Sequence, residues 1–249
     1  MDEGEFFRRL DLAGLKSERQ RSHSRKISGD VFDHETLMGL YRLARKGVFT
    51  EITGVVSSGK EANVYHGLRG GADVALKIYK VETSDFKHMS VYIRGDPRFG
   101  SWKNRRQLVY MWAQKEYKNL KRACDTVPCP KPIAAHDNIL AMEFIGENGF
   151  PAPRLRDKEP AEPQRYYDMV MGYVKEMYKL NLVHADLSEY NILDRNGPVL
   201  IDFSAGVLLD HPKATEFLER DVGNIVNYFR GLGADADYGK AMKEVLDAG

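Results

Sequence analysis

The sequence predicts an α+β fold of two lobes, in which an antiparallel sheet carrying one main helix is followed by a mainly helical half. Two patterns predict it. Short runs rich in Val, Ile, Thr and Tyr, separated by glycine-containing turns, fill much of the first half, and apolar residues recur at helical spacing through the second. The 249 residues, 43% hydrophobic and 29% charged, have the size and composition of a globular protein whose two lobes share a cleft.

The composition narrows the possible functions. The formal net charge is +1, so no overall field favours DNA, and any basic function must be local. Cys124 and Cys129 have no His or Cys partners at metal-ligand spacing, which argues against a zinc site and favours a reducing compartment. The start of the chain is acidic where a signal peptide is basic, and no apolar run is long enough to cross a bilayer. We therefore expect a cytoplasmic protein without membrane association.

The first elements are a charged arm and a helix. Residues 1–32 are highly charged, with basic residues crowded at 17–26, which predicts a flexible arm or a short docking helix. The sheet lobe is expected at 33–145. Its first helix is capped by Asp33 and ends at Lys46-Gly47, and its apolar face consists of Leu37, Leu40, Tyr41 and Ala44.

The middle of the sheet lobe alternates between strands and one polar segment. Residues 82–106 contain six Lys and Arg against three Asp and Glu, together with two glycines, and we interpret them as a mobile basic loop. A helix is expected from about Leu108 to Ala123. The expected strands are Phe49–Val56, Ala62–Gly67, Asp73–Tyr79, a short strand near Ile133, and Ile139–Ile145.

The helical lobe is expected at 146–249, beginning with the exit from a linker at 146–153. Two short strand-like pieces, at 192–194 and 199–201, separate its long helices. The helices are predicted from apolar residues at helical spacing: Tyr166, Val170, Tyr173, Val174 and Met177 in the first, and Leu218, Val222, Ile225 and Phe229 in the second.

The turn from Gly54 to Lys60 has two interpretations. Gly54 and Gly59-Lys60 have the spacing of a Walker loop, but Glu61 stands where such a loop needs Ser or Thr, and the residues that follow favour a strand instead of a helix. The alternative is a strand–turn–strand hairpin whose Ser57, Ser58, Gly59 and Lys60 cover nucleotide phosphates.

Val74-Ala75-Leu76-Lys77 is close to the Val-Ala-Ile-Lys strand of protein kinases. A lysine among apolar strand residues needs a counter-charge or a phosphate, because burying its ammonium alone is costly. Glu116, on the following helix, is the predicted counter-charge. The alternative is an edge-strand lysine that reaches solvent along its apolar stem.

The segment Leu182–Leu193 carries the most specific spacing. His184, Asp186 and Asn191 match the kinase catalytic loop, and Asp202 follows at the end of the next strand. Asp186 is predicted to orient an acceptor hydroxyl and take its proton. Asn191 and Asp202 are predicted to hold a divalent ion on the phosphates. Together with Lys77 they predict a protein-kinase-like phosphotransferase that uses ATP and Mg²⁺, with Mn²⁺ as a substitute.

Ser57–Tyr65, His184–Asn191 and Ile201-Asp202 together resemble the RIO family of atypical serine/threonine protein kinases. The resemblance is to its first subfamily, in the compact archaeal-like form, whose phosphate loop reads Ser-Thr-Gly-Lys-Glu-Ala. It covers about residues 35–245. It implies the two-lobed protein-kinase-like fold without an activation loop or peptide-binding subdomains. The sequence agrees, because His211-Pro212 and a helix follow Asp202 almost at once.

The resemblance also implies site residues and partners. Backbone groups of Glu143 and Ile145 are expected to bind adenine, with Met142 behind it. The implied activity is serine autophosphorylation or ATPase-like turnover during maturation of the small ribosomal subunit, with contacts to its RNA, and Asp202 itself is a possible phosphoryl acceptor. Serine acceptors are expected in the basic loop, at Ser84, Ser90 or Ser101.

Three functions follow from these residues. The first is an active phosphotransferase with ribosomal partners. The second is a nucleotide-gated assembly factor that turns ATP over slowly, favoured by the missing substrate platform. Ala185 and Ser188 stand where ordinary serine kinases have Arg and Lys. The third is a Walker-type NTPase, against which Glu61 argues.

Overall fold

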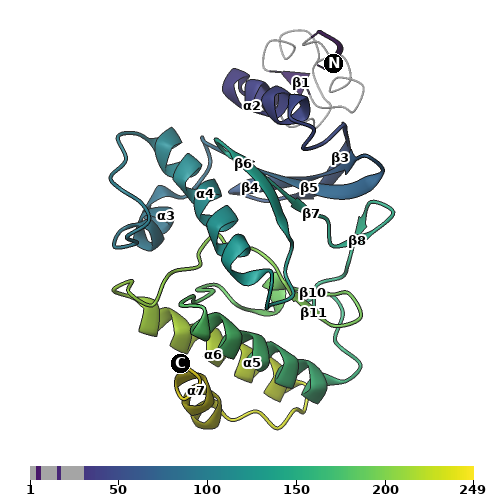
Figure 1. The fold of residues 1–249 in the computed structure, drawn as a ribbon. Coiled ribbons are helices and arrows are strands. Elements are labelled where there is room, and N and C mark those ends of the chain that lie inside the picture. Colours follow the sequence, from purple (N-terminus) through teal and green to yellow (C-terminus); the bar gives the residue numbers. More distant parts are fainter. Residues whose placement is uncertain (1–3, 7–15, 18–30) are drawn as a thin grey trace.

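The computed structural model describes residues 4–6, 16–17 and 31–249 (Figure 1). Nearly all of the predicted basic arm lies outside these residues. A sheet lobe stands above a helical lobe in the view of Figure 1. The sheet has the antiparallel order β3-β4-β5-β7-β6. Its strands are β3 (Glu51–Ser58), β4 (Ala62–Arg69), β5 (Ala72–Tyr79), β7 (Ile139–Glu143) and β6 (Pro132–His136), and β1 (Lys16–Ser17) pairs separately with β2 (Val31–Phe32).

Alternate residues of β5 face opposite sides of the sheet, as the pleat of a strand requires. Val74, Leu76 and Ile78 join the apolar cluster beneath helix α2 (His34–Arg45). Ala75 and Tyr79 join the larger cluster beneath helix α4 (Arg105–Ala123), which continues into the helical lobe. Lys77 lies in register with this second set and therefore points toward α4.

Helix α2 begins and ends where the sequence predicts. The Asp33 side chain accepts a hydrogen bond from the Thr36 backbone N–H at 2.7 Å and so caps the first turn. Gly47, just past the last turn, has φ +70°, in the left-handed region that glycine tolerates best. Leu37 and Leu40 are buried against the sheet.

The prediction of a mobile loop at 82–106 is wrong. This segment contains helix α3 (Phe86–Ile93), and α4 begins inside its last residues. Met89, Tyr92 and Ile93 are buried. Their i, i+3, i+4 spacing forms a short apolar stripe that the surrounding charges obscure in the sequence.

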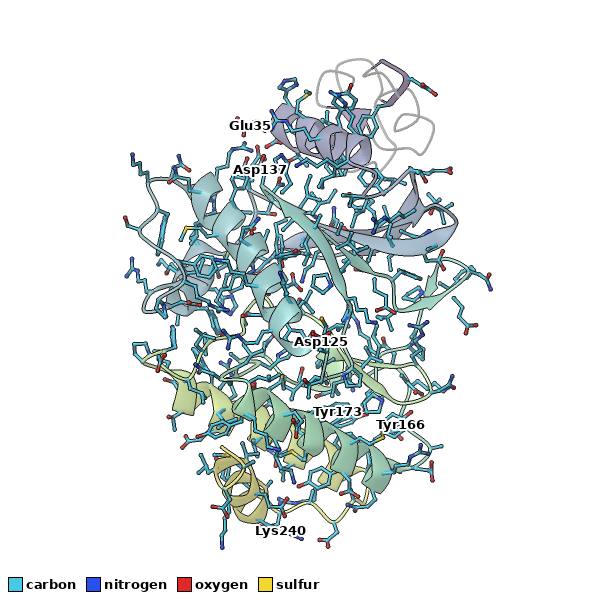
Figure 2. The ribbon with its side chains drawn as sticks, viewed as in Figure 1. Glu35, Asp125, Asp137, Tyr166, Tyr173 and Lys240 are labelled. Carbon is cyan, nitrogen blue, oxygen red and sulfur yellow. The ribbon has the colours of Figure 1, made fainter. Side chains whose placement is uncertain are left out.

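The helical lobe contains three long or medium helices and two small hairpins. Both predicted apolar stripes are in place: Tyr166, Val170, Val174 and Met177 are buried on α5, as are all four predicted residues of α6. Tyr173 of the first stripe is only half-buried. Figure 2 shows Tyr166 and Tyr173 on α5, and the Tyr166 hydroxyl donates to Asp194 Oδ1 at 2.5 Å. The elements are β8 (Gly146–Glu147), β9 (Phe150–Pro151), α5 (Pro163–Lys179), β10 (Ile192–Asp194), β11 (Pro198–Leu200), α6 (Ala214–Gly231) and α7 (Tyr238–Leu246).

The described helices and strands have two further properties. The described chain between β11 and α6 contains no further helix or strand, as expected for a fold without an activation loop. None of the helices in the described ranges has the length and apolar character that a bilayer span requires. The proposed lobe boundaries at 32/33 and 145/146 stay predictions.

Candidate active site

Lys77 joins the two lobes through a pair of carboxylates. Its Nζ lies 3.0 Å from Glu116 Oε1 on α4 and 2.8 Å from Asp202 Oδ1 in the helical lobe. Lys77 is buried, and burial alone would lower its pKa, but the charges of Asp202 and Glu116 raise the pKa above its ordinary value. The lysine therefore stays protonated, and the interpretation of Lys77 as a solvent-reaching edge lysine is wrong.

Glu116 is fully buried and receives two donors. Besides Lys77, the Tyr79 hydroxyl donates to Glu116 Oε2. Burial raises the pKa of Glu116, while Lys77 and Tyr79 act in the opposite direction. The predicted pairing of Glu116 with Lys77 is thus present, and Tyr79 is a partner that the sequence did not indicate.

Asp202 stands where the lobes meet. Its backbone has φ +60°, which is uncommon for a residue other than glycine. Within the described chain its polar contacts use Oδ1, which accepts from Lys77 and from the Ser204 hydroxyl at 2.7 Å, so Oδ2 is left for another ligand. Burial raises the pKa of Asp202, but Lys77 and Ser204 outweigh it and lower the pKa to about 2.

Asp186 and Asn191 lie together on the loop before β10. The Asn191 side-chain amide donates to Asp186 Oδ2 at 3.0 Å and to the Asp186 backbone oxygen at 2.8 Å. The amide nitrogen is therefore occupied, and the amide oxygen is the atom left to bind a cation. The Ile201 backbone N–H donates to the Asn191 backbone oxygen at 2.9 Å, which holds Asn191 beside Asp202.

Partial burial, followed by the negative charge of Asp202, raises the pKa of Asp186. Asp186 nevertheless keeps access to solvent, so a substrate can reach it. A carboxylate whose pKa is raised is a better proton acceptor near neutral pH.

Asp221 supports this loop and was not predicted. It is buried on α6, and its two carboxylate oxygens accept the backbone N–H groups of Ala185 at 2.6 Å and Leu187 at 2.9 Å. Arg220 also donates to the Ala185 oxygen. Burial raises the pKa of Asp221 to about 7, although both N–H donors oppose the shift. Ala185 has φ +65°, so these contacts hold a backbone conformation that alanine rarely adopts.

His184 fixes the loop from inside. Its Nε2 donates to the Ile201 oxygen at 3.1 Å, and its ring packs on Phe203 with centroids 4.7 Å apart. Burial lowers the pKa of His184 to about 4, so the ring is neutral near pH 7. His184 therefore links the loop containing Asp186 to the segment containing Asp202 without adding charge.

The predicted phosphate turn is a hairpin, because β4 begins at Ala62, directly after Glu61. The Walker interpretation, which requires a helix there, is wrong. The Gly59 N–H donates to the Ala62 oxygen at 2.9 Å. Three of the four predicted phosphate-binding residues, Ser58, Gly59 and Lys60, are exposed, and Ser57 is half-buried.

Residues that follow β5 hold the turn at Gly59-Lys60 through two hydrogen bonds. Lys80 Nζ donates to the Gly59 oxygen at 2.9 Å, and the Thr83 hydroxyl donates to the Lys60 oxygen at 2.8 Å. The sequence gives no signal for either contact, because both depend on where the chain leaves β5.

Glu143 ends β7, and Ile145 follows it. The Glu143 N–H donates to the Lys131 oxygen at 2.8 Å, and the Ile145 oxygen accepts from Ala152 N–H at 3.0 Å. Adenine binding by the backbone of these two residues stays a prediction.

Of the three predicted serine acceptors, Ser101 is exposed and Ser90 is half-buried. Ser84 is 2% exposed and donates to the Lys80 oxygen. Ser84 is therefore a poor acceptor.

A small sheet lobe with a Lys–Glu pair, placed over a helical lobe that presents Asp186, Asn191 and Asp202, defines a protein-kinase-like protein that lacks an activation loop. A family model of the RIO domain matches residues 63–241. The chain belongs to the RIO family of atypical serine/threonine protein kinases.

Individual proteins of this family are similar to the chain over most of its length. The chain is 42% identical over 234 residues to the RIO-type serine/threonine-protein kinase Rio1 of Methanocaldococcus jannaschii, covering 93% of this chain and 81% of that protein. It is 44% identical over 216 residues to the Rio1 kinase of Haloferax volcanii, covering 85% and 74%. The Rio2 kinase of Chaetomium thermophilum, solved as an ADP/Mg²⁺-phosphoaspartate complex, matches with a TM-score of 0.65 at 22% identity, over 84% of this chain and 65% of that one, just under two thirds. This last likeness concerns the fold.

Proposed function

We propose that the protein is an ATP- and Mg²⁺-dependent serine kinase that autophosphorylates, has ATPase-like activity, and acts in the cytoplasm in maturation of the small ribosomal subunit. The observation that carries the enzymatic part is the meeting of the lobes at Lys77, whose Nζ lies 3.0 Å from Glu116 and 2.8 Å from Asp202. Glu116 holds the ammonium of Lys77 in place, and a divalent cation on Asp202 would offset the second carboxylate, so that the ammonium can bind a phosphate.

The residues fit a magnesium nucleotide. Asp202 Oδ2 and the Asn191 amide oxygen are hard oxygen donors, and Mg²⁺ is usually held by one or two protein ligands together with phosphates and water. Mn²⁺ accepts the same donors. The bound cation neutralises charge on the phosphates, while Lys77 and the turn Ser57–Lys60 hold them in position.

Asp186 is the proposed proton acceptor. It orients the serine hydroxyl and takes its proton as the γ-phosphoryl group transfers. Adenine binds to backbone groups of Glu143 and Ile145, with Met142 behind it. Ser90 and Ser101 are the proposed acceptors, and an aspartyl-phosphate on Asp202 is the corresponding intermediate of an ATPase-like cycle.

Pre-ribosomal RNA is the proposed macromolecular partner. In the segment 82–106, Arg94, Lys103 and Arg105 are exposed, and exposed cations bind RNA phosphates without sequence preference. The basic residues at 17–26 are proposed to contribute as well. Neither DNA nor a membrane is proposed as a partner.

A nucleotide-gated assembly factor is the second candidate. It is favoured by the direct passage from Asp202 to α6, which leaves no platform for a peptide, and by the position of α3. The Tyr92 ring of α3 stacks on Phe217 of α6 with centroids 4.8 Å apart. In this case slow ATP turnover changes how the lobes are held, and that change is the output.

The test is incubation with γ-labelled ATP and Mg²⁺, followed by mapping of any labelled residue. We expect label on Ser90 or Ser101 that is stable to acid and to hydroxylamine. Label that is labile to hydroxylamine would favour the gated ATPase cycle. Absence of nucleotide binding in calorimetry with Mg²⁺ present would refute both candidates.

A further inference from the structure

Helix α4 carries three buried polar side chains within five residues, and the pair with Lys77 explains only one of them. Lys115, Glu116 and Asn119 are each fully buried. Glu116 binds Lys77. Lys115 and Asn119 instead contact the backbone immediately after Asp202.

Within the described part of the chain, the hydrogen bonds of Lys115 all go to backbone carbonyl oxygens. Its Nζ donates to the oxygens of Ser204 at 3.1 Å, Ala205 at 2.9 Å and Gly206. Burial lowers the pKa of Lys115, but three acceptors match the three N–H donors of the protonated amine. Burying an ammonium without a contacting carboxylate costs desolvation free energy, and an apolar side chain would fill the same volume without that cost. The lysine therefore calls for a reason other than packing.

Asn119 completes the same cradle. Its Nδ2 donates to the oxygens of Phe203 at 2.8 Å and Gly206 at 2.7 Å. A Cβ on Gly206 would lie 2.8 Å from that nitrogen, so the close approach requires glycine. Together the two side chains bind the carbonyl oxygens of four successive residues, 203–206.

Arg98, in the segment 82–106, sets the orientation of the Asn119 side-chain amide. Arg98 Nη1 donates to Asn119 Oδ1 at 2.7 Å, which turns the amide nitrogen toward the carbonyl oxygens. Arg98 is itself held by buried Asp96, with Nε–Oδ1 at 2.9 Å and Nη2–Oδ2 at 2.7 Å. This carboxylate also offsets the positive charge that Arg98 brings near Lys115.

The residue that this cradle controls is Asp202. A non-glycine residue at φ +60° keeps that conformation only if the structure around it fixes the chain on both sides. On the N-terminal side of Asp202, the Ile201 N–H donates to the Asn191 backbone oxygen. On its C-terminal side, Lys115 and Asn119 donate to the carbonyl oxygens of residues 203–206. The direction of Asp202 Oδ2 depends on these anchors.

We propose that Lys115 and Asn119 are positioning residues that hold the Asp202 carboxylate in its metal-binding orientation through the backbone of residues 203–206. The proposal rests on the proposed function, because it assumes that Asp202 binds the cation of a nucleotide. It adds that α4 fixes both the phosphate lysine, through Glu116, and the metal acid, through Lys115 and Asn119.

The test compares Lys115→Met with Lys121→Met, an exposed lysine on the same helix. Two affinities are measured in each protein: that for ADP in the presence of chelator, by calorimetry, and that for Mn²⁺ at saturating ADP, by the electron paramagnetic resonance of the free ion. We expect Lys115→Met to weaken Mn²⁺ binding by about 10-fold, as loss of an outer-sphere support does, with metal-free ADP affinity unchanged. Lys121→Met should match the wild type in both.

Equal Mn²⁺ affinity in Lys115→Met and Lys121→Met would overturn the proposal. A proportional loss of both affinities would also overturn it, because that result indicates general damage to the cleft. If Lys115→Met does not fold, Asn119→Leu, which removes two of the anchoring donors, takes its place with the same readouts. Failure of the wild type to bind ADP and Mn²⁺ would instead refute the proposed function on which the inference rests.

Discussion

The carboxylates of the site differ in what surrounds them, and so in what each can do. Asp202 has a lowered pKa because of Lys77, although burial opposes it, and it stays charged for a cation. Asp186 has a raised pKa from partial burial and from the charge of Asp202, which suits a proton acceptor. Both carboxylate oxygens of Asp221 accept backbone N–H groups, which fixes the shape of the loop that contains Asp186. One residue type thus occupies three different environments, and we propose a different role for each.

The first prediction concerns Asp186. We expect Asp186→Asn to bind ATP and Mg²⁺ as the wild type does but to lose phosphoryl transfer by a factor of about 10²–10⁴, because proton acceptance fails while the phosphate clamp survives. Transfer is measured with γ-labelled ATP and binding by calorimetry. Equal transfer in the two proteins would remove the proposed mechanism.

The second prediction concerns acid stability. The pKa of Asp202 falls from an ordinary value of 3.8 to about 2 on folding, so its stabilisation is present above pH 3.8 and is lost as the pH falls toward 2. Each pKa unit corresponds to about 1.4 kcal/mol, and we expect only about 1 kcal/mol in total because solvent screens the partly exposed carboxylate. Unfolding free energies of wild type and Asp202→Asn, measured in urea between pH 2 and 5, should converge at the acid end. Parallel curves would contradict this account.

At this scale the sequence predicts residues that lie in short contiguous motifs. The contact of Asp186 with Asn191 was predictable because both lie in one kinase-like motif, and that of Lys77 with Glu116 because a buried lysine needs a partner. Their roles toward phosphate stay predictions. The contacts of Asp221 and Lys115 were not predictable, because each binds main-chain atoms 36 and 89 residues away, respectively, and backbone atoms leave no signature in a sequence.

At the scale of elements, α2 is anchored to the sheet lobe at its start. Asp33 caps the helix and also accepts from Arg106 of α4 at 2.8 Å, while Arg106 Nη1 lies 2.6 Å from Glu35 Oε2. Figure 2 shows Glu35 and Asp137 in the upper part of the sheet lobe, where α2 meets the sheet. A local cap and a longer-range ion pair therefore share one carboxylate.

The third prediction separates these two contributions. Asp33→Ala should lower the free energy of unfolding by about 1 kcal/mol because the cap is lost. Asp33→Asn should be nearly neutral, since asparagine also caps helices and a half-exposed ion pair contributes little. Both are measured by urea denaturation. An equally large loss in Asp33→Asn would assign the stability to the ion pair instead.

Helix α3 shows why element prediction failed at 82–106. Its buried stripe is only three residues long and lies among six Lys and Arg, so composition favours a loop. The helix is stabilised by packing of Tyr92 and Met89 against α4 and α6, which only the tertiary structure supplies. The strands and long helices were predictable because their apolar periodicity is sustained.

At the scale of the whole molecule, one apolar cluster joins the two lobes. It runs from Ala75 and Leu140 in the sheet through α4 to α5 and α6. Helix α3 adds a second link, since Tyr92 stacks on Phe217 and its hydroxyl accepts from Arg220 at 3.2 Å. We therefore expect the lobes to unfold together.

The fourth prediction tests this link. Tyr92→Ala should lower the free energy of unfolding by about 3 kcal/mol, the usual cost of removing a buried aromatic ring. Tyr92→Phe, which keeps the stack and loses only the hydroxyl, should cost about 1 kcal/mol. Urea denaturation followed by circular dichroism measures both. Similar losses in the two variants would show that the hydroxyl, and not the ring, makes the connection.

The pleat of β5 has a consequence for how this chain tolerates insertions and deletions. Even-numbered and odd-numbered residues of the strand pack in different apolar clusters, with Val74, Leu76 and Ile78 on one face of the sheet and Ala75 and Tyr79 on the other. Adding or removing one residue just ahead of Lys77 would turn both Lys77 and Tyr79 toward the apolar cluster under α2 and leave Glu116 without either donor. Length changes can therefore accumulate in the Gly70-Gly71 turn, but not within β5 itself.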